Sequence, residues 1–347
     1  MDVLIIYQFC TFGGVERVVL NRAKAFKNNH RDVNLTVGYL HDPGALGSFQ
    51  AYILEHQLEK YLSALVISDD TYLGLDQYDY IFVIDTPQIF EKVKNNKNVY
   101  IECHTPYIEN RQYLKDIPGN IQGIIVPSAS FQSLILTEFQ DLPPIHIIPN
   151  TVPEEFYADE SGTENLYFSQ RPLTYFGRLD ELKNFEEARK IFHLFNDNED
   201  VFFIVIGNGA NNIATNHSLE KNLLFEKSLL RNQIDFDKAP YLNKLVRQHR
   251  GVFISPSKAE SFGLCAAEFI SGGVPVLLSN IPEHCALVED DQRFLYPLSD
   301  IESAKQKLDY LLNNWEKMSL QIKDYSKKFR DRVFINAWDK LINPSSG

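Results

Sequence analysis

The sequence predicts an α/β protein with two doubly wound domains, each a parallel sheet covered by helices. Short apolar runs alternate with longer mixed segments, as strands and crossover helices do. This alternation breaks near Pro149 and restarts at Leu173. The length of 347 residues also suits two domains of roughly 100–200 residues each.

The apolar runs of the first half are short, continuous and rich in Val, Ile and Tyr, as strands buried on both faces should be. Helices are expected between them, at Val15–Lys27 and Phe49–Leu58. The expected strands are Val3–Tyr7, Val33–Tyr39, Tyr80–Ile84, Val99–Cys103 and Gly123–Pro127.

The second half repeats this arrangement, and the run from Ile301 to Trp338 has helical spacing of its apolar residues. The expected strands are Leu173–Phe176, Val201–Gly207, Gly251–Ile254 and Val274–Leu278. The expected helices are Phe185–Phe195, Tyr241–Gln248, Leu264–Ser271 and Glu283–Glu289.

These patterns divide the chain into four parts. Residues 1–155 form a first Rossmann-like domain, 156–172 a linker, 173–330 a second Rossmann-like domain, and 331–347 a C-terminal helix that could pack back on the first domain. The polar segment Glu164–Gln170 resembles a protease tag site with its last two residues transposed, and carries no functional argument. Two switch-point crevices facing each other would form a cleft for an elongated ligand.

Composition excludes several function classes. The formal net charge of −12 is shared by both halves, which argues against nucleic acid as a partner, because phosphate binding needs a basic surface. We expect no membrane span and no signal peptide. The four cysteines form no CxxC pair, so reduced thiols in a cytoplasmic protein are expected.

One predicted helix carries a local excess of basic residues. A solvated helix face is the simpler interpretation, and a surface for a membrane or an acceptor is the alternative. The residues are Arg17, Arg22, Lys24, Lys27 and Arg31.

Gly13 and Gly14 lie between the first strand and its helix. They let the backbone approach a ligand closely, and the helix N-terminus offers free N–H groups to an anion. A common tight turn is the alternative, and the pattern is not the GxGxxG of dinucleotide sites.

The loop after the first strand of the second domain contains Gly177, Arg178 and Lys183. Two cations at the carboxyl end of a strand could clamp a diphosphate, Arg doing so bidentately; two solvated surface charges are the alternative. Gly207 ends the next strand in a Gly-x-Gly turn, which could lie against a nucleotide or simply be a turn.

The segment from Ser255 to Glu268 carries the strongest signal. It follows a strand and opens a helix, so its backbone N–H groups make an anion site. Glu260 can accept hydrogen bonds from sugar hydroxyls, and Glu268 from a ribose. The N–H groups belong to Ser261, Phe262, Gly263 and Leu264.

Three motifs together resemble the retaining GT-B glycosyltransferases of family four, the glycosyl transferases group 1. They are Gly-Gly-Val-Glu-Arg near the start, Gly-Arg-Leu followed by Lys-Asn, and Glu-Ser-Phe-Gly with a second glutamate eight residues later. Their order and spacing match from Gly13 to about Asn280. The resemblance implies the GT-B fold and transfer of a sugar, with retention of configuration, from a nucleoside-diphosphate sugar to an acceptor hydroxyl.

The resemblance also implies roles for single residues. Arg178 and Lys183 would bind the diphosphate and stabilise the leaving nucleotide. Glu260 and His104 would contact the donor sugar, and Glu268 would contact the ribose. The alternative for His104 is a histidine at a strand end whose hydrogen bonds are all made to neighbouring residues. Gly13 and Gly14 would leave room near the phosphates. The donor site as a whole comprises Gly13, Gly14, Gly177, Gly207, Ser261, Phe262, Gly263, Leu264 and Glu268.

The acceptor is expected at first-domain loops. Tyr107 and Arg111 follow His104 and could line an acceptor groove. Two departures from the family pattern are the bulky Phe269-Ile270 after the second glutamate and Asp237 where the family commonly has Gly, which leaves the base open between UDP and GDP types.

No cofactor and no metal are expected, because Arg178 and Lys183 would supply the positive charge. The expected partners are a nucleotide sugar and a glycan, lipid-linked or protein acceptor. The location would be cytoplasmic, and the prediction leaves room for weak peripheral contact with the inner membrane face.

Two other function classes remain open at this stage. A sugar-nucleotide epimerase or a glycoside phosphorylase could share the two-domain fold, although no motif for either is present. A non-catalytic nucleotide-binding module is the other alternative. The presence of Arg178, Lys183, Glu260 and Glu268 together argues against it.

Overall fold

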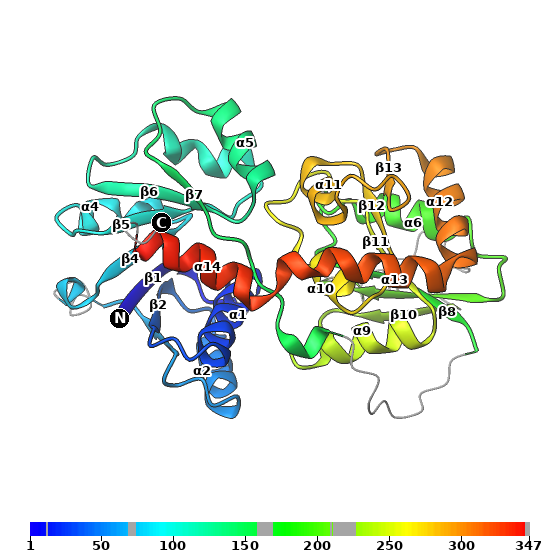
Figure 1. Ribbon diagram of the computed structural model, residues 1–347, viewed down its shortest axis with the longest axis horizontal. Helices are drawn as coiled ribbons and strands as arrows, with labels where there is room; N and C mark the ends of the chain where they lie inside the picture. Colours follow the sequence, from blue (N-terminus) through cyan, green and yellow to red (C-terminus); the bar gives the residue numbers. More distant parts are fainter. Residues whose placement is uncertain (12, 69–73, 158–168, 209, 211–226, 344–347) are drawn as a thin grey trace. The chain divides into compact units, whose positions relative to one another are not determined.

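The computed structural model divides the chain into two compact units, and each has a parallel sheet of its own (Figure 1). Unit 1 comprises Met1–Pro153 and Phe329–Gly347, and unit 2 comprises Glu154–Lys328. The structure describes residues 1–11, 13–68, 74–157, 169–208, 210 and 227–343. Residues 158–168 of the expected linker and most of the tag-like segment therefore lie outside the described residues, as does Gly209.

Unit 1 has a seven-stranded sheet in the order β3-β2-β1-β4-β5-β6-β7, with every pairing parallel. The strands are β1 (Asp2–Phe9), β2 (Asn34–His41), β3 (Leu62–Val66), β4 (Tyr80–Ile84), β5 (Val99–Glu102), β6 (Ile121–Val126) and β7 (Ile145–Ile147). The helices are α1 (Gly14–Asn28), α2 (Leu46–Glu55), α4 (Phe90–Val93), α5 (Ala129–Glu138) and α14 (Asp331–Ile342), with 3-10 turns η1 (Leu75–Gln77), η2 (Pro87–Ile89) and η3 (Ile108–Lys115).

Unit 2 has a six-stranded parallel sheet in the order β10-β9-β8-β11-β12-β13. The strands are β8 (Arg171–Phe176), β9 (Val201–Ile206), β10 (Ser228–Arg231), β11 (Val252–Ser255), β12 (Val276–Ser279) and β13 (Leu295–Tyr296). The helices are α6 (Phe185–His193), α9 (Lys238–Gln248), α10 (Leu264–Ser271), α11 (Pro282–Val288), α12 (Ile301–Asn313) and α13 (Trp315–Tyr325), with 3-10 turns η4 (Glu154–Phe156) and η5 (Ser326–Phe329).

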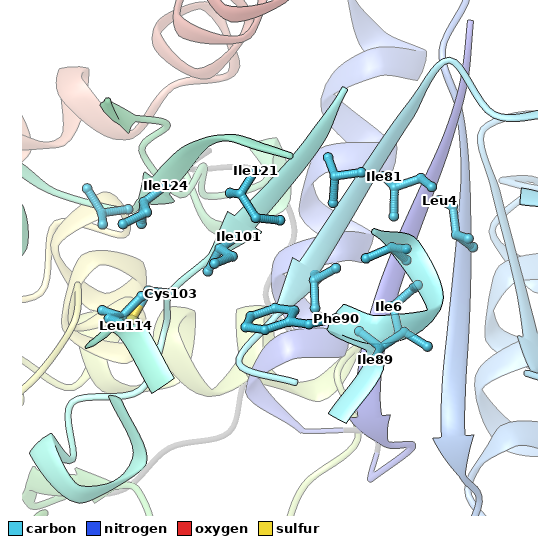
Figure 2. Packing of buried hydrophobic residues seen from close by; sticks show 14 of the residues in the cluster. Leu4, Ile6, Ile81, Ile89, Phe90, Ile101, Cys103, Leu114, Ile121 and Ile124 are labelled. Atoms are coloured by element: carbon cyan, nitrogen blue, oxygen red, sulfur yellow. The ribbon is translucent and has the colours of Figure 1, made fainter. Parts of the chain in front are cut away.

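Both faces of the unit 1 sheet are buried. Figure 2 shows one face, where Leu4 and Ile6 of β1 lie in a core with Ile81 of β4 and Ile101 of β5. Phe82 points to the other face, because successive side chains of a strand alternate, and there it contacts the ring of Trp338 on α14 at 5.5 Å. Helix α14 also packs against α1, beside which it lies in Figure 1.

Both faces of the unit 2 sheet are covered as well. Phe253 of β11 stacks on Phe269 of α10, with ring centroids 4.3 Å apart. Phe203 of β9 stacks on Phe192 of α6 at 4.7 Å. Phe253 lies opposite Thr174 of β8, and Thr174 lies opposite Ile204 of β9, so these three side chains point to the same face of the sheet. Phe203 is the neighbour of Ile204 in β9 and therefore points to the opposite face. Helices α10 and α6 therefore cover opposite sides of the sheet.

The predicted α/β fold with two doubly wound parallel sheets is confirmed. Several boundaries differ from expectation: α2 and α9 each begin three residues earlier than expected, and the single helical run from Ile301 to Trp338 is three helices. The run breaks because Asn314 ends α12, and a 3-10 turn at Ser326–Phe329 precedes α14. Among the described residues, no helix is long and apolar enough to cross a bilayer.

Replacing Trp338 by Ala should strongly destabilise unit 1. The side chain is 1% exposed, and its indole contacts Phe26 at 5.0 Å as well as Phe82. Truncating a buried Trp typically costs about 3–5 kcal/mol. Urea unfolding followed by circular dichroism should show an earlier midpoint for this variant. Val333→Ala, at a position 38% exposed on the same helix, should stay within about 0.5 kcal/mol of the wild type. Equal midpoints for Trp338→Ala and the wild type would mean that α14 adds nothing to the stability of unit 1.

Candidate functional site

The candidate site of unit 2 lies at the switch point of its sheet. Strands β8 and β11 are neighbours, but the chain leaves β8 toward β9 on one side and β11 toward β12 on the other. Ligands of doubly wound sheets bind at the carboxyl ends of the strands at such a point. The loop after β8 carries Arg178 and Lys183, and the loop after β11 carries Glu260.

The two loops are tied together by a charged pair. The ammonium of Lys183 donates to both carboxylate oxygens of Glu260, at 2.6 Å each. Both side chains are largely buried, with 22% and 10% of their surfaces exposed. Ser257 donates a further hydrogen bond of 2.8 Å to the same carboxylate. Burial by itself would raise the pKa of Glu260, but nearby charge, chiefly that of Lys183, together with the hydrogen bonds from Lys183 and Ser257 outweighs it and holds that pKa below its usual range.

Two further hydrogen bonds to backbone carbonyls hold the same two loops together. The side-chain amide of Asn184 donates to the carbonyl of Pro256 at 3.1 Å, and the backbone N–H of Lys258 donates to the carbonyl of Leu182 at 2.8 Å. Asn184 has a φ of 53°, in the left-handed region, where it begins helix α6. Lys183 therefore reaches Glu260 from a fixed turn, 77 residues away along the chain.

Arg178 is more exposed than Lys183, at 57% of its side-chain surface. Its guanidinium donates to Asp180 at 2.6 Å, and the other oxygen of Asp180 accepts the backbone N–H of Lys183 at 2.8 Å. Asp180 therefore orients both cations of this loop.

His284 lies beneath the Glu260 loop, and sequence reasoning did not single it out. The imidazole is fully buried. Its Nδ1 lies 3.0 Å from the backbone carbonyl of Ser279, and its Nε2 lies 3.5 Å from the hydroxyl of Ser255. Burial lowers its pKa to about 4, so the ring is neutral at pH 7. The one feature of the sequence that could have indicated His284 is its place in helix α11, which follows β12, the strand next to β11.

Helix α10 presents its N-terminus at the same edge. Gly263 precedes the helix with a φ of 86°, a conformation that a side chain would strain. Phe262 is buried, whereas Ser261 and Leu264 are partly exposed. Glu268 directly follows Ala267, whose backbone N–H donates to the carbonyl of Gly263, and its side chain is 1% exposed.

Gly177 and Gly207 lie against each other where β8 and β9 end. A Cβ on Gly207 would lie 2.0 Å from the carbonyl oxygen of Gly177, so only glycine fits there. Gly207 is buried and Gly177 partly exposed. Gly207 therefore shapes the floor of this loop through packing.

In unit 1 the loop with Gly13 and Gly14 follows β1, which is next to the switch point between β1 and β4. Glu16 fixes this loop from inside: its carboxylate accepts the backbone N–H of Gly13 at 2.6 Å and that of Thr11 at 3.3 Å. The side chain of Glu16 is fully buried. A Cβ on Gly14 would meet no described atom within 4 Å, so space is open beside it.

His104 follows β5 at the same edge of the unit 1 sheet. Its Nε2 lies 2.6 Å from a carboxylate oxygen of Glu102, and its backbone N–H donates to Asp85 at 2.9 Å. Glu102 is also bound by both terminal nitrogens of Arg22 on α1. Burial opposes the charge of Glu102, but Arg22 and His104 together keep its pKa well below the usual range.

Several basic residues of helix α1 and of the segment just after it have partners inside unit 1. Arg22 is buried on Glu102, Lys27 donates to the carbonyls of His56 and Gln57, and Arg31 pairs with Asp339. The solvated face expected for this helix is therefore wrong for Arg22, which points into the unit.

Tyr107 and Arg111 lie on the loop and 3-10 turn after His104, and the structure separates their roles. Tyr107 is partly exposed. Arg111 is 1% exposed, and its guanidinium binds Glu138 at 2.6 and 2.7 Å and donates to the carbonyl of Thr105 at 2.9 Å. The expectation that Arg111 touches an acceptor is therefore revised: the residue is used inside the unit, to hold this loop on α5.

A cavity of about 640 Å³ in unit 1 lies away from these residues. It opens at the amino ends of β1 and β4, the opposite end of the sheet from His104, with Met1, Asp79, Tyr80 and Asn98 among its lining residues. The predicted site residues thus form two groups. Gly13, Gly14 and His104 lie at the carboxyl edge of one sheet; Arg178, Lys183, Glu260 and the start of α10 lie at that of the other.

The second group lies in a segment that matches a known family. Residues 163–329 match the family model described as glycosyl transferases group 1. A curated relative, the UDP-Gal:α-D-GlcNAc-diphosphoundecaprenol α-1,3-galactosyltransferase of Escherichia coli, is 32% identical over 174 residues, which are 46% of this chain and 43% of the relative. The matched segment thus spans less than half the length of that relative.

Solved glycosyltransferase-like structures share the fold over the whole chain. HepE of Anabaena, in complex with UDP and glucose, superposes with a TM-score of 0.78 at 16% identity, over 99% of this chain and 100% of that one. A variant of TarM from S. aureus, in complex with fondaparinux, α-GlcNAc-glycerol and UDP, gives a TM-score of 0.75 at 13% identity, over 99% of both chains. The predicted GT-B fold is confirmed, and the comparisons support a glycosyltransferase.

The two glycines of the site should respond differently to a methyl group. Gly207→Ala should lower stability by about 3 kcal/mol or more, because the methyl would collide with the backbone of Gly177. Gly14→Ala should leave stability unchanged or slightly raised, because its Cβ has room and Ala favours the helix. Thermal unfolding of the two variants measures the contrast. A Gly207→Ala protein as stable as the wild type would show that the two loops are not packed as described.

Stability should depend on pH through His284. Its folded pKa of about 4 lies below the ordinary 6.5, so the unfolded chain binds more protons between these values. The contribution is complete above pH 6.5 and is lost as pH falls toward 4, which amounts to about 2–3 kcal/mol between pH 7 and 4.5. Urea unfolding across this range should show a shallower pH dependence for His284→Gln than for the wild type. Identical slopes would place the imidazole in solvent.

Proposed function

We propose that this chain is a retaining glycosyltransferase that moves a sugar from a UDP-sugar to an acceptor hydroxyl. The Lys183–Glu260 pair carries the proposal. It places a cation for phosphate and a carboxylate for sugar hydroxyls in contact at the switch point of the group 1 glycosyltransferase domain. Doubly wound sheets bind their nucleotides at that point.

The donor would lie along the carboxyl edge of the unit 2 sheet. Arg178 and Lys183 would hold the diphosphate, helped by the N–H groups of Ser261 to Leu264 at the start of α10. Glu260 would accept hydrogen bonds from sugar hydroxyls and Glu268 from the ribose. Because Asp180 orients both Arg178 and Lys183, the cations are already in place when the donor arrives.

In the reaction, the bond between the anomeric carbon and the diphosphate oxygen breaks, and the acceptor oxygen bonds to that carbon on the same face. The acceptor proton goes to the departing phosphate oxygen. Negative charge grows on the diphosphate, and Arg178 and Lys183 stabilise it in a partly buried setting where the effect is large. These two cations fill the role that a metal ion has in other transferases, so we propose a metal-independent enzyme that needs no cofactor.

UDP is the proposed nucleotide and galactose the first sugar to test. The curated relative takes UDP-Gal by its name, and the HepE and TarM structures were solved with UDP. The acceptor would be a glycan, lipid-linked or protein-linked, in polysaccharide, glycolipid or glycoprotein glycan synthesis. A lipid-linked acceptor, as the relative's name describes for that enzyme, would bring the chain to the cytoplasmic face of the inner membrane.

Unit 1 would bind the acceptor. Gly13 and Gly14 would leave room near the phosphates, and His104 would contact the donor sugar. Tyr107 would contact the acceptor directly. Arg111 would act indirectly, by holding the Thr105 loop against Glu138.

Thermal unfolding with UDP, GDP, ADP, CMP and NAD, each near 1 mM, tests the donor site. A ligand at about 100 times its dissociation constant adds about 2.7 kcal/mol, a shift of several degrees for a chain of this size. We expect a rise with UDP. A rise with NAD alone would overturn the family function, and no rise with any ligand would favour a non-catalytic module.

Arg178→Ala and Lys183→Ala should remove the UDP shift and lower kcat of UDP-galactose transfer about 10²–10³-fold, with EDTA leaving the wild-type rate unchanged. Arg189→Ala is the matched control, because Arg189 is a cation of the same unit paired with Glu186. It should keep full activity. Isomerisation of the donor without transfer would identify an epimerase instead.

A further inference from the structure

Three polar side chains in unit 1 form a buried chain that ends at His104. Arg22 on α1 is 1% exposed, and Glu102 at the end of β5 is fully buried. The His104 side chain keeps 11% of its surface exposed. The guanidinium of Arg22 holds both oxygens of Glu102, one at 3.0 Å, and one of these oxygens lies 2.6 Å from His104 Nε2. Contact with solvent is therefore confined to the last member.

The charges fix where the protons lie. A carboxylate offers no proton, so it can only accept, and the nitrogen of His104 that faces Glu102 must carry the hydrogen. Glu102 stays ionised because a buried carboxylate next to a bidentate guanidinium is far more stable charged than neutral. In a neutral imidazole the proton on Nε2 leaves Nδ1 as an acceptor.

The rest of the His104 ring is open. Its Nδ1 receives no hydrogen bond from any residue in the described part of the chain, and it lies on the partly exposed side chain. The neighbouring ionisable groups are otherwise engaged. Asp85 accepts the backbone N–H of His104 and the hydroxyl of Tyr113, and Arg111 is paired with Glu138.

We propose that Glu102 is a positioning residue that fixes the tautomer of His104, so that Nδ1 accepts a hydrogen bond from a sugar hydroxyl, and that Arg22 keeps Glu102 in the form required. This inference rests on the proposed function, because it assigns the polarity of the contact between His104 and the sugar. The same argument explains an arginine buried in a helix that sequence reasoning placed in solvent.

The polarity has a consequence for substrates. An Nδ1 acceptor selects a group that can donate, such as a hydroxyl, over a fluorine or an ether oxygen of similar size. Helix α1 also begins at the Gly13–Gly14 loop, and Arg22 holds that helix on β5. The orientation of His104 is therefore tied to the loop that would leave room for the phosphates.

Nitrogen-15 NMR of histidine-labelled protein at pH 7.5, without ligand, tests the tautomer directly. Comparison with His104→Gln identifies the His104 signals. We expect the wild type to show a protonated Nε2 and an unprotonated Nδ1. Protonation on Nδ1 alone, or on both nitrogens, would overturn the inference. This readout needs neither substrate nor activity, so it is independent of the proposed function.

Glu102→Gln gives the second arm. One oxygen of Glu102 serves both Arg22 and His104, so the carboxamide can turn its NH₂ toward either oxygen position and no longer fixes one tautomer. We expect imidazole protonated on Nδ1 to appear beside the Nε2 form, and a loss in kcat/KM for UDP-galactose transfer of up to about tenfold. Asp339→Asn, which removes the exposed partner of Arg31 just after helix α1, should change neither. An unchanged tautomer in a folded Glu102→Gln protein would overturn the role of Glu102.

Should Glu102→Gln fail to fold, the wild-type spectrum decides by itself. Activity separates the two proposals. If His104→Gln transfers sugar at the wild-type rate while the wild-type tautomer is as expected, the role of His104 in the proposed function fails and the assignment of its protons stands.

Discussion

Parallel strands buried on both faces leave only their ends for polar chemistry, and this constraint organises the whole molecule. In both sheets the first strand along the chain lies at the centre and the order reverses beside it, between β1 and β4 and between β8 and β11. Loops that leave these strands in opposite directions open a space at the carboxyl edge. The candidate functional residues lie at those edges: His104 in one unit, and Lys183 with Glu260 in the other.

Burial of acids at these edges requires cations from distant parts of the chain. Glu260 is matched by Lys183, Glu102 by Arg22, and Glu138 by Arg111. A carboxylate without such a partner would lose its charge in a low-dielectric setting. Each pair therefore does two things: it holds two elements together, and it keeps an acceptor ionised at a fixed place. Removing one partner is costly, since the other charge stays buried.

The two units use this arrangement differently. In unit 2 the charged pair is itself the proposed contact surface, with Lys183 for phosphate and Glu260 for sugar. In unit 1 the pair of Arg22 and Glu102 is hidden, and only His104 reaches solvent. The family match covers residues 163–329, and the fold is shared over nearly the whole chain with structures below 20% identity.

The sequence by itself determined the inner strands and the motif positions. All nine strands expected from apolar runs are inner strands of the two sheets, and the four it missed, β3, β7, β10 and β13, are the edge strands. Inner strands are largely apolar because both faces and both edges are covered, whereas the edge strands are short, at two to five residues, so no long apolar run marks them. Tertiary structure alone decided the partners. Lys183 meets Glu260 across 77 residues, Arg22 meets Glu102 across 80, and His284 lies under the loop after β11. Periodicity describes a residue's own element, but these contacts depend on which strands become neighbours, and only the sheet order sets that.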